Sequence, residues 1–368
     1  METALLTLIP ILQEAFKWNL SRTKCAAAII IGLIKTRSVN LVQLATALPG
    51  EAKIESKYRR IQRLMKDINI DMETIAHFIA NQLPQTKYTL LIDRTDWKFG
   101  NTYINILFLT IYHQGYTIPI LWTTLPQSKK CGNTNTKERI LLIKQFIEIF
   151  GIEKIESVIG DREFIGTEWF NYLIDNNINF LIRIKHNIKI SRVNGGSAPA
   201  RNFFRNLRCG ESIQLSNKRK IFGVKLYITG MKLQTGELLI IAHNYSASCE
   251  QVLNDYKKRW GIECFFKTLK SEGFDFETTH LTDPKKIDKL IAFMAIACVW
   301  SCKTGEWLNN EEDIKVKKHG RKAISIFRYG LDYLREIFFN IEEKICQLQM
   351  VLGLIQRVPN RFGAVLNC

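Results

Sequence analysis

Apolar side chains recur at helical spacing through the first 84 residues of the chain. Five stretches carry this pattern, and turn residues such as Pro49 and Gly50 interrupt the series. The stretches are LLTLIPILQEAF, CAAAIIIGLIK, VNLVQLATAL, SKYRRIQRLMK and METIAHFIANQL. We therefore expect a helical N-terminal region over residues 1–84.

The pattern changes to that of strands from Lys87 onward. YTLLID, NTYINILFLTIYH and TIPILWTTL are rich in β-branched and aromatic residues, which predicts neighbouring strands joined by hairpins. A helical pattern over residues 133–150, a strand IESVIG, a helix TEWFNYLIDNN and a strand FLIRIK follow. This order predicts an α/β (α+β) fold with a ribonuclease-H-like mixed sheet that has helices on its faces.

The second half of the chain predicts a β-rich insertion and then a return to helix. Residues 187–245 contain SIQLS, KIFGVKLYITGMKL and ELLIIAHN, which alternate apolar and polar positions. Beyond Pro284, the segments IDKLIAFMAIACVW and AISIFRYGLDYLREIFFN are helical in pattern. We expect a helical region over 1–84, a central domain over 85–285 with the insertion inside it, and a helical region over 286–368.

The chain is strongly basic. It has 52 Lys and Arg residues against 35 Asp and Glu, a net charge of +17, which attracts nucleic acid or an anionic membrane surface. No apolar run approaches the roughly 20 residues that span a bilayer, and METALLTLIP does not have the pattern of a secretory signal. We expect a cytoplasmic, nucleoid-associated protein that does not act on membranes. The scattered cysteines and histidines show no metal-binding spacing.

The segment 57–66 concentrates positive charge around an apolar stripe. Its basic residues are Lys57, Arg59, Arg60, Arg63 and Lys66, and the stripe is Ile61, Leu64 and Met65. Such a helix can lie against DNA or can be a solvated surface helix. The basic character of the whole chain favours DNA.

The stretch YKKRWGIECFFKTLK carries charged residues at helical spacing. Tyr256, Arg259, Glu263 and Lys270 follow the pattern Y-x2-R-x3-E-x6-K. At about 100° per residue they occupy one sector of roughly 60° on a continuous helix. A carboxylate can hold a metal ion, and the cations and the phenol can contact phosphates. The alternative is a solvated face with an ordinary ion pair.

Two aspartates follow predicted strands and complete a set of three acids with Glu263. Asp93 comes after LLI and Asp161 after SVIG, each at a predicted strand end. Carboxylates placed in this way can hold two divalent cations about 4 Å apart, as two-metal enzymes do, and Mg²⁺ (or Mn²⁺) suits oxygen ligands. Asp96 and Glu163 are nearby competitors for these roles.

LLIDRTDWKFG, VIGDREF and the Y-x2-R-x3-E-x6-K stretch together resemble the DDE transposases of the insertion sequence 4 family. FDFETTHLTDPKKIDKL and RKAISIFRYGLDYL are also similar to family segments. The resemblance implies a ribonuclease-H-like catalytic domain interrupted by a β insertion, two-metal phosphodiester hydrolysis and strand transfer. It also implies a homodimer on double-stranded DNA, holding terminal inverted repeats and target DNA, with DNA binding expected from region 1–84 and dimerisation from 286–368.

The family roles transfer to particular positions. Asp93, Asp161 and Glu263 resemble the metal-binding catalytic triad, Tyr256, Arg259 and Lys270 resemble phosphate contacts, and Arg162 resembles a further DNA contact. The insertion lacks the tryptophan that family members can use to hold an extruded base. That role is open between Phe203, Phe204, Phe222 and Tyr227, and a hairpin intermediate remains a family expectation.

Some residues and two rival functions remain to be weighed. Trp97 and Trp260 are expected to be core aromatics before stacking partners, and His280 a packing or turn residue before a site residue. A ribonuclease-H-like nuclease that cuts without joining would use the same triad. An inactive remnant would only bind DNA. The Tyr, Arg and Lys partners favour transposition, and the presence of the three acids argues against decay.

Overall fold

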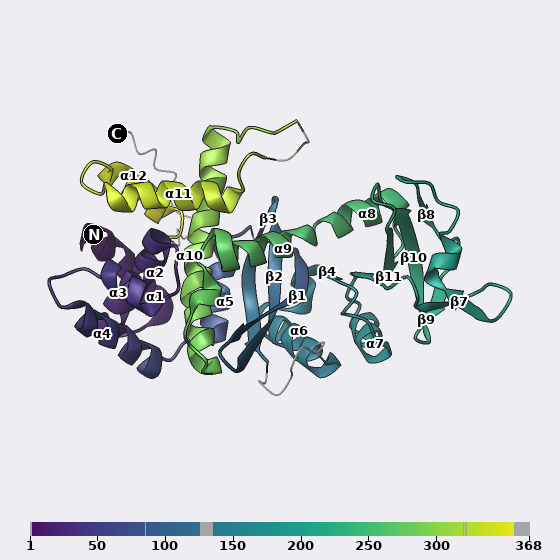
Figure 1. Ribbon diagram of the computed structural model, residues 1–368, viewed down its shortest axis with the longest axis horizontal. Helices are drawn as coiled ribbons and strands as arrows, with labels where there is room; N and C mark the ends of the chain where they lie inside the picture. Colours follow the sequence, from purple (N-terminus) through teal and green to yellow (C-terminus); the bar gives the residue numbers. More distant parts are fainter. Residues whose placement is uncertain (1, 85, 126–134, 319, 321, 357–368) are drawn as a thin grey trace. The chain divides into compact units, whose positions relative to one another are not determined.

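The computed structural model describes residues 2–84, 86–125, 135–318, 320 and 322–356. The chain forms two compact units. One comprises Met1–Gln85 together with Lys267–Cys368, and the other is Thr86–Phe266. The two helical regions expected separately at the ends of the sequence therefore belong to one unit. Figure 1 labels the elements of both units.

A mixed β-sheet forms the core of the unit Thr86–Phe266. Its first strands are β1 (Tyr88–Phe99), β2 (Thr102–His113), β3 (Tyr116–Thr124), β4 (Ile155–Gly160) and β5 (Phe180–Arg183). They lie in the order β3-β2-β1-β4-β5, with β1 to β3 antiparallel, β4 parallel to β1 and β5 parallel to β4. This is the ribonuclease-H-like arrangement that the order of elements predicted, so the fold class is confirmed.

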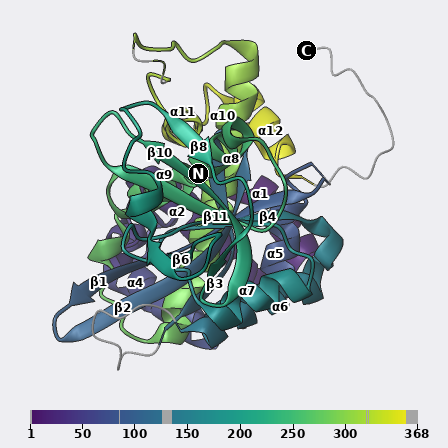
Figure 2. The ribbon, with the colours of Figure 1, turned by 90° about the vertical axis from the view of Figure 1, so that its right-hand side faces the viewer.

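The segment predicted as an insertion extends this same sheet. β11 (Leu238–His243) pairs with β5, β10 (Val224–Lys232) pairs with β11, and β8 (Ser212–Gln214) pairs with β10. β9 (Arg219–Ile221) also pairs with β10, while β6 (Lys189–Ser191) and β7 (Ser197–Pro199) form a separate small ribbon. Figure 2 shows these added strands towards the viewer. The insertion thus continues the sheet from β5.

Helices cover the sheet and bring the third acid to it. They are α6 (Thr136–Phe150), α7 (Thr167–Asp175), α8 (Cys249–Lys257) and α9 (Trp260–Lys267). Residues 104–111 of β2 are buried without interruption, which requires cover on both faces of the sheet. On one face, the rings of Phe265 and Phe266 in α9 lie 5.4 and 5.9 Å from the ring of Phe108.

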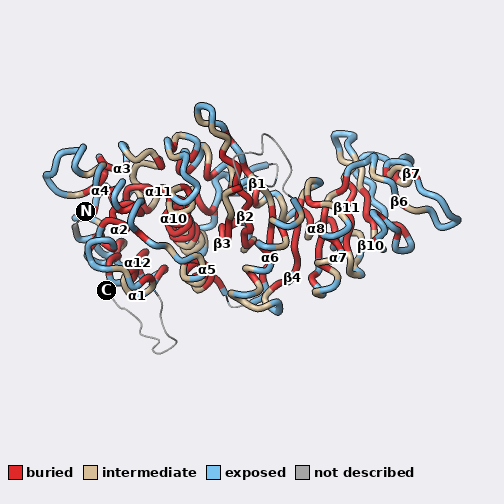
Figure 3. The backbone as a smooth tube through the Cα atoms, turned by 90° about the horizontal axis from the view of Figure 1, so that it is seen from below, coloured by how far each residue is buried: buried red, intermediate tan, exposed pale blue. Residues whose placement is uncertain are grey.

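The other unit is helical and is built around one long buried helix. Its N-terminal helices are α1 (Glu2–Phe16), α2 (Leu20–Thr36), α3 (Leu41–Ala47), α4 (Ile54–Asp67) and α5 (Met72–Ala80), and its C-terminal helices are α10 (Pro284–Glu311), α11 (Ile326–Phe339) and α12 (Ile345–Gly353). Each helix predicted for residues 1–84 is therefore present. Residues 290–302 of α10 are buried on every side (Figure 3), as expected for a helix at the centre of a bundle.

Two glycines set the crossing of α10 and α11. A Cβ at Gly305 would lie 1.9 Å from the carbonyl oxygen of Ile326, and one at Gly330 would lie 1.9 Å from that of Ser301. Only the absence of a side chain at both positions allows the two backbones to approach this closely.

Across the described ranges, no single helix combines the length and apolar character needed to cross a membrane. The bent pair α2 and α3, which meet at 101°, passes that test jointly, by length and composition alone.

Candidate active site

The register between β1 and β4 places Asp93 beside Asp161. The last parallel pair of these strands is Ile92 with Gly160, and the two aspartates are the next residues on each strand. Since paired strands lie about 4.8 Å apart, the two acids emerge next to each other. The prediction that Asp93 ends its strand is wrong in one respect, because β1 continues to Phe99 in pairing with β2. The parallel pairing with β4 is what ends there.

Tight packing fixes the turn that carries Asp161. The backbone N–H of Phe164 donates to the carbonyl of Asp161 at 2.9 Å, and the Phe164 ring is fully buried. A Cβ at Gly160 would lie 3.1 Å from the Cβ of Phe164 and 3.4 Å from Cγ2 of Ile92. The chain therefore reverses directly after β4, and Asp161 sits on a constrained turn.

An ion pair links the two segments that hold the aspartates. Nε of Arg94 donates to Oε2 of Glu163 at 2.7 Å, and both side chains are largely buried. Nη1 of Arg94 also lies 3.4 Å from Oδ1 of Asp96. The two competing acids are thus held by the guanidinium of Arg94, whereas Asp93 accepts from the Arg94 backbone N–H, at 2.8 Å.

Glu263 is carried by a helix that is shorter than the sequence predicts. α8 ends at Lys257, and α9 begins at Trp260 after a tight turn in which the N–H of Arg259 donates to the carbonyl of Tyr256 at 3.0 Å. Beyond α9, Thr268–Glu272 form a π-helical turn. The expectation of one continuous α-helix with a single charged face is therefore wrong. Between α8 and α9, hydrogen bonds between residues i and i+3 replace the α-helical bonds between residues i and i+4.

The tight turn nevertheless gathers Tyr256, Arg259 and Glu263. Nη1 of Arg259 lies 3.0 Å from Oε1 of Glu263 and 3.9 Å from Oδ2 of Asp93. The guanidinium carbon also lies 5.9 Å from the ring centroid of Tyr256. The Arg259 side chain is only 13% exposed, so a nearly buried cation bridges two of the three acids.

Burial and mutual repulsion perturb the ionisation of this cluster. The pKa of Asp93 is raised to about 7, mainly by burial and to a smaller extent by the charges of Asp161 and Glu263, against the opposing effects of the Arg94 N–H and of Arg259. Burial also raises the pKa of the Tyr256 phenol, against the effect of Arg259. Asp93 is therefore partly protonated near neutral pH. The phenol of Tyr256 keeps its proton and can donate a hydrogen bond.

Two buried oxygen atoms of the site lack partners. Within the described ranges, Oδ1 of Asp161 and the phenolic oxygen of Tyr256 are buried and accept or donate no hydrogen bond. Such an atom costs about 1–3 kcal/mol, so a ligand that satisfies it is favoured. Carboxylate oxygens are the donors that hard divalent cations take.

The three carboxylates are not arranged around one common position. Among the described residues, no group of three His, Cys, Asp or Glu side chains is arranged to hold a metal ion. Glu263 is held by Arg259 instead. The donor chemistry of the three carboxylates fits a divalent cation.

Two other predicted contacts, Lys270 and Arg162, belong to different units of the chain. Lys270 belongs to the helical unit, where its ammonium lies 2.8 Å from Oε1 of Glu277. Arg162 is exposed and lines a cavity of about 420 Å³ in the unit of the acids. Arg183, Lys185, His186 and Arg201 share this cavity. Glu237 also lines it and pairs with Arg183, so Arg162, directly after Asp161 in the chain, belongs to a mostly basic surface.

The basic segment 57–66 forms α4, with the expected stripe of Ile61, Leu64 and Met65 buried. Arg59, Arg60 and Arg63 are exposed. Lys57 differs from them, because its ammonium donates to the carbonyl of Leu48 at 2.8 Å and so caps α3.

The aromatic residues divide differently from the sequence expectation. Trp97 is buried, as expected, but Trp260 is 57% exposed at the start of α9, so its assignment to the core is wrong. In the sheet extension, Phe204 is buried against Gly230, whereas Phe222 is 40% exposed.

Comparison with known proteins identifies the family. The family model described as "Transposase DDE domain" matches residues 84–300. A search of curated proteins gave no match. The matched range includes β1, the turn after β4 and α9, which carry the three acids. Since the match covers more than half of the 368 residues, the chain belongs to the family of transposases with a DDE domain.

Proposed function

We propose that the protein is a DNA transposase of the insertion sequence 4 type. It would cut DNA at the ends of its element and join the exposed 3′-OH to target DNA. The observation that carries this proposal is the placement of Asp93 beside Asp161 by the β1–β4 register, with Arg259 joining Asp93 to Glu263.

Asp93, Asp161 and Glu263 would hold two divalent cations, Mg²⁺ or Mn²⁺. When bound, these ions activate the attacking oxygen and stabilise the leaving oxygen of a phosphodiester. With Glu263 holding a cation, the Arg259 guanidinium would be able to bind a phosphate oxygen through a charge-assisted hydrogen bond. The unpartnered phenol of Tyr256 can donate to the same phosphate.

The substrate would be double-stranded DNA with terminal inverted repeats, joined to target DNA within a homodimer in the nucleoid. The net charge of +17 supports a polyanionic substrate. The exposed arginines of α4, Arg162 and Lys270 are the proposed backbone contacts. A ribonuclease-H-like nuclease would use the same acids, so the joining step is what separates the two functions.

One assay tests this proposal. Purified protein is incubated with a labelled element end, a supercoiled target plasmid and Mg²⁺ or Mn²⁺, and the products are resolved on denaturing gels. We expect cleavage at the element boundary and a covalent product between the end and the plasmid. Cleavage without that product would indicate a nuclease, and binding without cleavage would indicate an inactive remnant. Either result contradicts the proposal.

A further inference from the structure

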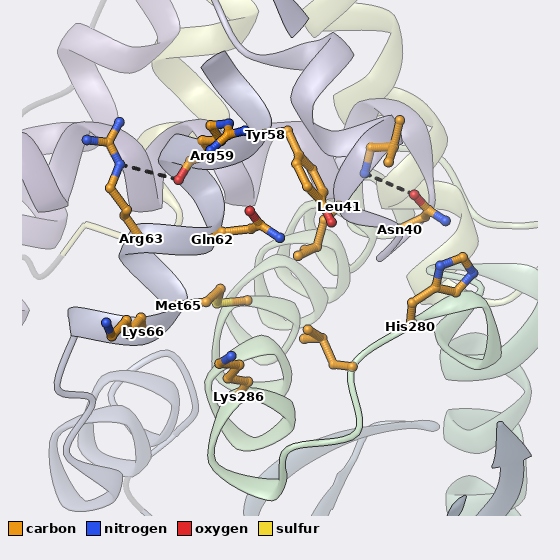
Figure 4. A pocket seen from close by; sticks show the side chains of 12 residues that line it. Asn40, Leu41, Tyr58, Arg59, Gln62, Arg63, Met65, Lys66, His280 and Lys286 are labelled. Atoms are coloured by element: carbon orange, nitrogen blue, oxygen red, sulfur yellow. Dashed lines mark hydrogen bonds between the residues drawn. The ribbon is translucent and has the colours of Figure 1, made fainter. Parts of the chain in front are cut away.

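A basic cavity of about 680 Å³ lies within the helical unit, whereas the three acids belong to the other unit. One wall is α4, with Arg59, Arg63 and Lys66, and the other is the segment that leads into α10, with His280 and Lys286. Figure 4 shows these two walls and the side chains that line them. Residues more than 200 positions apart in the sequence therefore share one cavity.

The charged side chains that line this cavity are all of one sign. Lys66 and Lys286 join two arginines, and Tyr58, Gln62 and Asn40 add neutral hydrogen-bonding groups. Of the residues that line it, none is an acid, and none of its arginines or lysines is in an ion pair within the described part of the chain. Neighbouring cations without counter-charges produce a local field that attracts an anion.

A neighbouring cavity on α4 shows the contrast. It has a volume of about 310 Å³ and is lined by Arg22, Arg60 and Arg63, but Asp67 also lines it. On this side of α4 a carboxylate therefore accompanies the arginines. On the side that faces Lys286, no acid lines the cavity.

The two walls are fixed to each other by hydrogen bonds. Nζ of Lys289 in α10 donates to the carbonyls of Met65 and Lys66 at 2.9 and 3.1 Å, at the C-terminal end of α4. The N–H of Val39, just before α3, donates to the carbonyl of Phe274 at 2.9 Å. The cavity is thus held in shape without a ligand, which lowers the cost of binding.

The arrangement of the cations indicates which anion fits. Arg59, Arg63 and Lys66 are spaced over about 10 Å of helix, which is the axial rise of about three phosphates on one DNA strand. Arginine and lysine, with tyrosine, asparagine and glutamine, are the side chains that contact the DNA backbone. A single small anion would engage only part of such a row.

We propose that this cavity binds the DNA backbone, with α4, His280 and Lys286 holding phosphates of the same duplex. The inference rests on the proposed function, because that function makes DNA the substrate. It adds Lys286 and His280 as DNA contacts, and it gives the chain that follows the catalytic helix a role in holding the duplex.

The test compares Lys286→Ala with Lys285→Ala in the full-length protein. Lys285 is the exposed neighbour that does not line the cavity, so it is a matched control for loss of one charge. Binding to a duplex with the element end and to a duplex of scrambled sequence is measured by fluorescence anisotropy with EDTA present, over a series of salt concentrations. EDTA keeps cleavage out of the measurement.

We expect Lys286→Ala to weaken binding of both duplexes about fivefold and to reduce the slope of log K against log salt by about one. Lys286→Gln, which keeps most of the side chain, should behave in the same way, and Lys285→Ala should bind like the parent. Parental affinity and slope in Lys286→Ala would overturn the inference. An equal loss in Lys285→Ala would also overturn it, because the effect would then be general charge.

The failure of this inference can be told apart from the failure of the proposed function. If the parent cuts and joins DNA while Lys286→Ala binds normally, the cavity is not a DNA site and the function stands. If Lys286→Ala loses affinity while the parent neither cuts nor joins DNA, the cavity stands and the function falls.

Discussion

The guanidinium of Arg259 donates to the carboxylate of Glu263 at 3.0 Å, across the junction between a tight turn and α9. The same Nη1 lies 3.9 Å from Oδ2 of Asp93, so one cationic side chain lies between two of the three acids. In the proposed function, Glu263 would hold a divalent cation and Arg259 would contact a phosphate oxygen of the DNA.

Arg259→Ala should therefore lower cleavage while leaving the site able to bind cations. The loss of a charge-assisted hydrogen bond to phosphate is worth about 1.5–3 kcal/mol, or about 10- to 100-fold in rate. Single-turnover cleavage over a range of Mg²⁺ concentrations measures both effects. Half-saturation should move to lower Mg²⁺, because Glu263 no longer has a competing partner. An unchanged cleavage rate would remove Arg259 from the site.

The raised pKa of Asp93 predicts how the stability of the metal-free protein depends on pH. An acid whose pKa rises from 3.8 to about 7 on folding binds its proton more tightly in the folded state. Its contribution to the free energy of unfolding is therefore most favourable at low pH and falls as the pH rises towards 7, by at most about 4 kcal/mol.

Thermal unfolding in EDTA between pH 5 and pH 8 tests this dependence. The midpoint should fall with rising pH in the parent and should fall less in Asp93→Asn, which cannot ionise. Addition of Mg²⁺ at pH 8 should restore the parental midpoint. Identical pH profiles for the parent and the variant would contradict the burial of an ionisable Asp93.

The ion pair between Arg94 and Glu163 predicts that the competing acids act structurally. Glu163→Gln should lower stability and should disturb cleavage through the position of Asp161, because the pair links the two aspartate segments. Asp96→Asn should cut close to the parental rate, since Asp96 is an exposed partner of the same arginine. Loss of cleavage in Asp96→Asn at unchanged stability would show that the wrong aspartate of the DRTDW motif has been chosen.

Gly261 determines how closely α9 approaches the sheet. A Cβ there would lie 2.3 Å from Oγ1 of Thr117 and 3.0 Å from Cδ2 of Tyr112. Gly261→Ala should therefore push α9 outward, move Glu263 and reduce cleavage at least tenfold, since small displacements of catalytic groups are costly. Thr117→Ala removes the nearest atom and should restore part of the activity when combined with Gly261→Ala. An active Gly261→Ala protein would contradict the close packing of α9.

Local sequence patterns predicted the parts of the fold that depend on local chemistry. Helical spacing placed α1 to α5, and runs of β-branched residues placed β1 to β5. The acids were found because each follows such a run or lies on a predicted helix. The pairing of β11 with β5 was not predictable in this way, because a partner strand leaves no mark on the local pattern.

The details of the site required tertiary structure. β1 continues beyond Asp93 through the DRTDWKF motif, where the buried residues Thr95 and Trp97 alternate with more exposed ones. This alternation can be assigned to a strand only once its partner β2 is known. No proline or preceding glycine in the sequence predicts the break between α8 and α9. Close packing of Gly261 on Thr117 accompanies the break, and Trp260 is left exposed beside it.

The central claim is that Asp93, Asp161 and Glu263 act together on a phosphodiester bond. The most direct measurement is metal-dependent cleavage of an element-end duplex by Asp161→Asn and Glu263→Gln, with binding of the same duplex measured in parallel. These variants remove a charge and keep the size of the side chain. We predict that both lose cleavage and retain binding of the end. Cleavage at the parental rate in either variant would contradict the claim.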